Sequence, residues 1–295
     1  MTAVRAPLTR RSLLLGLAGG FAFAAHRVTV GGPTVAGSEP LPIGPSGILP
    51  ETPPLSPVPP SVATVQARYA GAVPHEWGLA VTGTRTRLAL PDRRLALTFD
   101  ACGGHGGTAV DADLLGLLER ERLPATLFLN GRWIDANPTL AVRLAGNPLI
   151  ELGNHGTHHL PLSVTGRSAY GIAGTRSVAE VIDEVLVNHR RLQEITGVAP
   201  RWFRPGTAHC DEVAAAIVRD LGEEVVGFTV NGDSGATMPA AKVRGALTSA
   251  APGSIVIAHM NRPAGDTAEG LAAALPALRE QGHEFVTLSG AGALA

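Results

Sequence analysis

The chain has 295 residues, enough for one large domain or two small ones. Charged residues make up 17% of it and the formal net charge is −1, so no electrostatic argument supports nucleic acid or an anionic membrane surface as a partner. The two cysteines are too few for a disulfide-based scaffold.

The first 25 residues have the pattern of an export signal. Arg10 and Arg11 precede an apolar stretch from Leu13 to about Ala25, which is shorter than the roughly 18 to 20 residues of a membrane span. The arginine pair resembles a twin-arginine signal, and an ordinary secretory signal or an uncleaved anchor is the alternative. We therefore expect an exported protein (periplasmic, cell-wall associated or secreted) with no stable membrane span after signal cleavage.

Residues 26–61 are interpreted as a proline-rich linker. Positions 33 to 60 carry 10 of the 23 prolines, for example in "LPETPPLSPVPP". Such a segment cannot build a core and tends to extended conformations. No internal repeat is evident, so residues 62–295 are expected to form one catalytic domain.

Short apolar runs alternate with helical patterns in this domain. The candidate strands are Leu95–Phe99, Ala125–Leu129, Leu149–Leu152, Arg201–Phe203, Val225–Val230, Ile255–Ala258 and Glu284–Leu288. The clearest helix is "SVAEVIDEVLVNHRRLQEITG", where Ser177 and Glu180 form a capping box and Gly197 supplies the stop. This alternation predicts parallel strands covered by helices, in a barrel or a doubly wound sheet. In both folds, ligands bind at the carboxyl ends of the strands.

Polar side chains follow five of the seven candidate strands, at that expected edge. They are Asp100 after the first strand, His155 and His159 after the third, Arg204 after the fourth, Asp233 after the fifth and His259 after the sixth. Chance scatter would not favour one edge, so the pattern indicates a site.

The stretch "ELGNHGTHHL" is the strongest local signal. His155 and His159 are four residues apart. If the segment turns helically, their imidazoles share one face and can bind one metal ion. A histidine-rich surface turn is the alternative.

Asp100 ends the apolar part of "LALTFDACGG", where a glycine-rich loop begins. The carboxylate could be a metal ligand, a general base or a helix N-cap. The glycines would let a ligand approach the backbone closely, or they form a mobile connector.

Three further residues could serve catalysis. Arg204, which Pro205 biases to an extended conformation, could orient a carboxylate or form a surface salt bridge. His259 follows the buried-looking run "IVIA" and could be a general acid or a hydrogen-bonded core histidine. Asp233 could hold His259 in one tautomer and raise its pKa.

The order Asp, His-x-x-x-His, Arg-Pro, Asp, Ile-x-His resembles the polysaccharide deacetylase family, with its NodB homology domain (carbohydrate esterase family 4). The resemblance covers roughly residues 90–290. It implies an α/β fold, a distorted (β/α) barrel of about seven strands. It also implies a metal-dependent hydrolase that removes N- or O-acetyl groups from a cell-wall or extracellular polysaccharide. The divalent metal would be zinc, with cobalt or nickel as alternatives.

The same resemblance implies a role for each motif residue. The metal ligands would be His155 and His159, with Asp100 near both the metal and the attacking water. The catalytic residues would be Asp100 as base, Arg204 as its orienting partner, His259 as acid and Asp233 as the residue that tunes this acid.

The chain departs from the family pattern at Ala101, where a second aspartate usually supplies the third metal ligand. Asp100 could move onto the metal, or Cys102 could ligate, which would favour a zinc-like ion. Weaker candidates lie just beyond the loop, at His105, Asp111 and Asp113.

The cysteines and aromatic residues leave further alternatives. Cys102 and Cys210 could form a disulfide, remain free thiols, or supply a ligand. Aromatic residues are only 4% of the chain. Of the candidate stacking residues Trp77, Trp133 and Trp202, at least two are expected in the core.

Three functions therefore remain open. The first is the exported deacetylase acting on an acetylated glycan. The second is a glycan-binding pseudoenzyme that lost its chemistry with the missing aspartate. The third is a hydrolase of a non-sugar C–N bond, which the low aromatic content favours slightly. The oligomeric state is not predicted.

Overall fold

Nine strands form one sheet in the part of the chain described by the computed structural model, residues 60–89, 93–292 and 294–295. These residues belong to the unit Ser56–Ala295. The predicted export signal, and the predicted linker up to residue 59, lie outside the described residues.

The strands run parallel and follow the order β1-β6-β5-β4-β3-β2-β8-β7, with β9 also paired to β2. Their bounds are β1 Thr84–Arg85, β2 Arg94–Ala101, β3 Ala125–Leu129, β4 Ile150–Asn154, β5 Trp202–Phe203, β6 Glu224–Val226, β7 Val230–Asn231, β8 Ile255–His259 and β9 Glu284–Val286. The expected strand Val225–Val230 is divided between β6 and β7, and β1 was not predicted.

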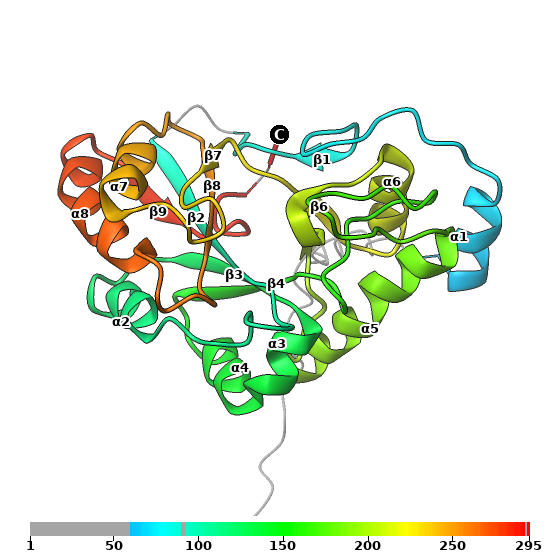
Figure 1. The fold of residues 1–295 in the computed structure, drawn as a ribbon, viewed down its shortest axis with the longest axis horizontal. Helices are drawn as coiled ribbons and strands as arrows, with labels where there is room; N and C mark the ends of the chain where they lie inside the picture. Colours follow the sequence, from blue (N-terminus) through cyan, green and yellow to red (C-terminus); the bar gives the residue numbers. More distant parts are fainter. Residues whose placement is uncertain (1–59, 90–92, 293) are drawn as a thin grey trace, which may run out of the picture. The chain divides into compact units, whose positions relative to one another are not determined.

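Helices cover the outer side of the curled sheet (Figure 1). They are α1 Val62–Tyr69, α2 Ala112–Arg120, α3 Gly131–Ala136, α4 Pro138–Ala145, α5 Val178–Thr196, α6 Glu212–Asp220, α7 Ala240–Thr248 and α8 Thr267–Glu280, with a short 3-10 turn at Gly206–Ala208. Within the described ranges, no helix has the length and apolar character needed to cross a bilayer. The expected distorted (β/α) barrel is confirmed.

Helix α5 begins and ends where the sequence predicts. The Ser177 side chain accepts a hydrogen bond from the backbone N–H of Glu180 at 3.2 Å, and Gly197 ends the helix with a φ of 79°. Only the second half of the capping box differs, because the Glu180 carboxylate accepts from the backbone N–H of Arg176 rather than of Ser177.

Strand β2 shows how the sheet separates core from site. Side chains alternate between the two faces of a strand. Its odd-numbered residues pack with helix residues in the largest core cluster: Leu95, Leu97, Phe99 and Ala101. The opposite face, here called the inner face, carries Ala96, Thr98 and Asp100. Ala96 packs there in a separate core cluster with Phe128 of β3, Trp202 of β5 and two residues that follow β9, Leu288 and Ala291.

Candidate active site

The carboxyl ends of four strands bring the predicted site residues together. Asp100 of β2 is in register with His259 of β8. His155 follows β4 directly, and Arg204 follows β5 directly. A cavity of about 520 Å³ opens at this edge, and Asp100, Cys102, His159 and His259 are among the residues that line it.

Arg204 holds Asp100 in place. Its Nη1 donates to Oδ1 of Asp100 and to the Thr98 hydroxyl, each at 2.8 Å. Its Nε and Nη2 donate to backbone carbonyls of residues 226 and 227, and its guanidinium lies over the Phe128 ring, 4.2 Å from the centroid. Arg204 is 0% exposed, which rules out the surface salt bridge considered from sequence.

The environment of Asp100 favours its ionised form. Burial alone would raise the pKa of Asp100, but the nearby positive charges, above all that of Arg204, outweigh burial and lower it below its usual value. Oδ1 is occupied by Arg204, and Oδ2 lies 3.7 Å from Nε2 of His155. Oδ2 is therefore the oxygen available to take up a proton.

The segment between the two histidines is not helical, contrary to the conditional expectation. His155 leaves β4, and His159 has a φ of 62°, in the left-handed region. The rings nevertheless meet edge to face, with centroids 4.8 Å apart. His155 Nδ1 donates to the carbonyl of Arg204 at 2.8 Å, which leaves Nε2 free to bind a metal ion.

Glu184 of α5 fixes this segment, and sequence reasoning did not single it out. Its buried carboxylate accepts hydrogen bonds from the backbone N–H groups of His158 and Leu160 at 2.9–3.1 Å. Burial raises the pKa of Glu184 to about 7, although these N–H groups oppose the rise. The available signal was a charged residue beside Val181 and Val185 on the apolar face of the predicted helix.

His259 is oriented by Asp233. The two oxygens of Asp233 accept from the His259 backbone N–H at 2.7 Å and from its Nδ1 at 2.9 Å, and the Thr267 hydroxyl also donates to this carboxylate. Burial opposes the imidazolium, but interactions with Asp233 and Cys102 raise the pKa of His259 well above its ordinary value. Nε2 of a protonated His259 is then the donor available to a substrate.

Cys102 lies among the histidines of the site. Its Sγ is 3.7 Å from Nε2 of His155. Burial disfavours a thiolate, but the histidines around it, His155 foremost, outweigh burial and hold the pKa of Cys102 well below its ordinary value. Cys102 and Cys210 are both free, so the disulfide considered from sequence is not formed.

One group of donor atoms among the described residues could hold a metal ion. It comprises Cys102, His155 and His159, whose ligand atoms all lie within 4.8 Å of one another. Thiolate and imidazole are the ligands that zinc prefers, so the donor set fits such an ion. Asp100 does not belong to this group, and its expected role as a metal ligand stays a prediction.

The remaining candidates have structural positions. Asp111 caps α2 by accepting from the backbone N–H of Leu114, and His105 and Asp113 are exposed. Trp133 and Trp202 are buried in the core, as predicted for at least two of the three tryptophans.

The glycine loop after Cys102 serves the fold rather than substrate access. Gly103 has a φ of 67°, and a Cβ there would lie 2.6 Å from the backbone nitrogen of Trp133. A Cβ at Gly107 would lie 2.4 Å from the carbonyl oxygen of Gly103. Residues 103–107 are absent from the cavity lining, so these glycines let the chain turn tightly behind Cys102.

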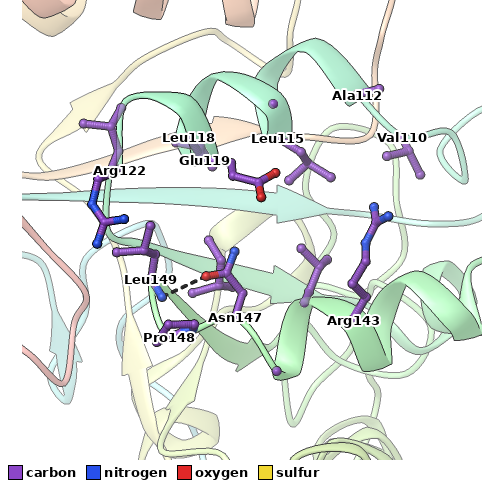
Figure 2. A pocket seen from close by; sticks show the side chains of 15 residues that line it. Val110, Ala112, Leu115, Leu118, Glu119, Arg122, Arg143, Asn147, Pro148 and Leu149 are labelled. Carbon is purple, nitrogen blue, oxygen red and sulfur yellow. Dashed lines mark hydrogen bonds between the residues drawn. The ribbon is translucent and has the colours of Figure 1, made fainter.

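A second cavity, of about 650 Å³, reaches the start of β4 at Leu149 and Ile150 and is lined by none of the predicted site residues. Figure 2 shows it between α2 and the α4 region, with Glu119 on one side and Arg143 on the other. Its lining is otherwise largely aliphatic and contains no histidine, cysteine or aspartate. We therefore assign the chemistry to the smaller cavity.

Comparison with known proteins finds a family match over part of the chain. Residues 87–226 match the polysaccharide deacetylase family model. A peptidoglycan-N-acetylglucosamine deacetylase of Listeria monocytogenes, PgdA, is 27% identical over 243 residues, 82% of this chain and 48% of that protein. The chain spans about half the length of the curated relatives it matches, 51% and 48% for two of them.

Two solved structures share the fold. A carbohydrate esterase family 4 pseudoenzyme from Bacillus anthracis has a TM-score of 0.58 and 23% identity, covering 72% of this chain and 68% of its own. A family 4 acetyl xylan esterase from Clostridium thermocellum, solved with a cobalt ion, has a TM-score of 0.54 and 22% identity, covering 67% and 89%. A polysaccharide deacetylase domain therefore matches residues 87–226 of the chain, and structures of carbohydrate esterase family 4 share its fold.

Proposed function

We propose that this protein is an exported, metal-dependent hydrolase that removes N- or O-acetyl groups from a cell-wall or extracellular polysaccharide. Support comes from the family and from relatives whose names specify peptidoglycan and xylan as substrates. The arginine pair and short apolar stretch at the start of the sequence support export.

The residues of the site fit a divalent metal ion. His155 Nε2 and His159 would hold the ion, and the half-buried Cys102 presents a sulfur to the same point. A bound ion of this kind supplies Lewis acidity, which polarises the acyl carbonyl and makes water more acidic. Zinc suits these ligands, with cobalt and nickel as alternatives.

The proton transfers fall to Asp100 and His259. Asp100, ionised and held by Arg204, accepts the proton that the attacking water loses. His259, protonated and held by Asp233, donates a proton from Nε2 to the nitrogen or oxygen of the sugar as the C–N or C–O bond breaks. Acetate and a free amine or hydroxyl are the products. Each transfer typically contributes about 10²- to 10⁴-fold in rate.

One observation carries the proposal: a buried carboxylate and a partly buried histidine, each fixed by its own charged partner, face one cavity beside the metal-binding group. Asp233 holds the His259 ring and is itself held by the Thr267 hydroxyl, so the orientation of the imidazole is fixed. The arrangement is that of an acid and a base on either side of a scissile bond.

The test is acetate release by the full chain from acetylated peptidoglycan fragments and acetylated xylan, before and after treatment with a chelator. Asp100→Asn and His259→Ala should each lower kcat by about 10²-fold or more. Asp113→Asn, which changes an exposed carboxylate on α2, is the matched control and should keep wild-type activity. Release that survives the chelator would contradict metal dependence.

A glycan-binding pseudoenzyme is the second candidate. Ala101 stands where the family usually has its second aspartate, and one of the similar structures is described as a pseudoenzyme. This candidate predicts glycan binding without acetate release. Release only from acetylated amides that lack a sugar would instead favour the third possibility, a hydrolase of a non-sugar C–N bond.

A further inference from the structure

We propose that the thiolate of Cys102 is the third metal ligand of this site, replacing the carboxylate missing at Ala101. The inference rests on the proposed function, because it names a ligand of the metal ion on which that function depends. It makes the site a Cys-His-His centre rather than an Asp-His-His centre.

The spacing of the donor atoms supports a single ion. Zinc binds sulfur at about 2.3 Å and nitrogen at about 2.0 Å, so two such ligands at a tetrahedral angle lie about 3.5 Å apart. Cys102 Sγ and His155 Nε2 are 3.7 Å apart. The donor atom of His159 lies within 4.8 Å of both.

The orientation of His155 is a separate observation in favour of this ligand set. Its Nδ1 is bonded to the carbonyl of Arg204 at 2.8 Å. In metal-binding histidines, the ring nitrogen that does not bind the metal commonly donates to such an acceptor. This hydrogen bond fixes the orientation of the ring and its tautomer. The remaining nitrogen, Nε2, is the atom that faces Cys102.

The alternation of β2 explains why residue 102 supplies the ligand and residue 101 does not. Ala101 is fully buried with the outer-face residues of β2 in the core that faces the helices. Cys102 is two residues beyond Asp100, and both line the cavity. Asp100 also lies 3.7 Å from His155, but its other oxygen is held by Arg204 and it lies outside the donor group.

A sulfur ligand has two consequences for the site. It favours thiophilic ions such as zinc and cobalt over magnesium, calcium or manganese. It also leaves Asp100 free of the metal, so the carboxylate keeps its role in proton transfer.

The test uses cobalt(II) added to the metal-free full chain and followed by absorption spectroscopy. Thiolate coordination adds a sulfur-to-cobalt charge-transfer band in the near ultraviolet to the visible ligand-field bands. Wild type and Cys210→Ala, whose altered thiol is fully buried in a core cluster and belongs neither to the cavity lining nor to the donor group, should show this band. Cys102→Ser should lose the band and bind cobalt at least about tenfold more weakly.

Cys102→Asp is a second variant, which puts a carboxylate at the same place. It should bind cobalt with visible bands and no charge-transfer band, which separates the loss of sulfur from a loss of folding. Visible bands without a charge-transfer band in wild type would overturn the Cys102 assignment and leave the metal-dependent function standing. A wild-type chain that binds neither cobalt nor zinc would overturn both.

Discussion

Glu184 offers a direct test of how the histidine segment is held. The carboxylate is buried under residues 156–160 and accepts the backbone N–H groups of His158 and Leu160. Glu184→Gln keeps the shape and one acceptor oxygen but removes the ionisable group. The substitution therefore isolates the contribution of that ionisation to the free energy of unfolding.

The expected magnitude follows from the shift in pKa. The ordinary pKa of 4.5 for a glutamate rises to about 7 for Glu184 in the folded protein. The folded state therefore binds this proton more tightly than the unfolded state. Its stabilising contribution is fully present below pH 4.5 and is lost as the pH rises through about 7. At about 1.36 kcal/mol per pKa unit, the loss amounts to about 3 kcal/mol.

The assay is urea denaturation of wild type and Glu184→Gln at a series of pH values from about 4 to about 8. The quantity of interest is the difference in unfolding free energy between the two proteins, because it cancels every other titrating group. We expect wild type to lose about 3 kcal/mol relative to the variant across this range. Glu194→Gln, an exposed change on the same helix, is the control and should leave the difference nearly flat.

Two results would refute this reasoning. If the difference in unfolding free energy between wild type and Glu184→Gln stays constant with pH, Glu184 has the same pKa in the folded and unfolded states. Its burial would then not be maintained in solution. A difference that moves in the opposite direction would mean that the backbone N–H groups favour the carboxylate more than burial opposes it.

Three further predictions concern the site. Arg204→Met should destabilise the fold by about 3 to 5 kcal/mol in urea denaturation, because it leaves the buried Asp100 carboxylate unpaired; no loss would contradict the ion pair. Ala101→Asp should lower the free energy of unfolding by several kcal/mol, because residue 101 faces the core, and it should not tighten zinc binding measured by calorimetry. Tighter zinc binding at an unchanged free energy of unfolding would show that the new carboxylate reaches the metal. Tyr170, which is 78% exposed and lines the cavity, should stack on substrate, so Tyr170→Ala should raise KM several-fold and leave kcat nearly unchanged; an unchanged KM would remove that contact.

The fold could be predicted where burial leaves a mark on the sequence. Parallel strands covered on both faces are apolar throughout, so runs such as Ala125–Leu129 appear directly as strands, and β3 has these bounds. β1 could not be predicted, because Thr84–Arg85 is short and polar and becomes a strand only by pairing with β6. The run from 225 to 230 divides because β6 pairs with β1 and β5 while β7 pairs with β8.

The positions of the site residues could be predicted better than their conformations. Asp100, His155, Arg204 and His259 lie at one edge because the strands are parallel and each of these residues ends or follows one. The left-handed conformation of His159 depends on hydrogen bonds that Glu184 makes from a helix about 25 residues further along the chain. Local sequence carries no sign of that contact, and the i, i+4 spacing suggested a helical turn instead.

Ala101 shows how counting along a strand changes the meaning of a missing ligand. Read as a motif, "TFDAC" lacks the carboxylate beside Asp100 and suggests a damaged metal site. Read as a strand with a period of two, it places residues 98, 100 and 102 on the inner face and 97, 99 and 101 in the core. The ligand-bearing position is then 102, where the chain has a cysteine that can bind metal. On the proposal that Cys102 is the third ligand, the substitution moves this ligand by one residue and changes its chemistry from oxygen to sulfur, and Ala101 is then no argument for a lost metal site.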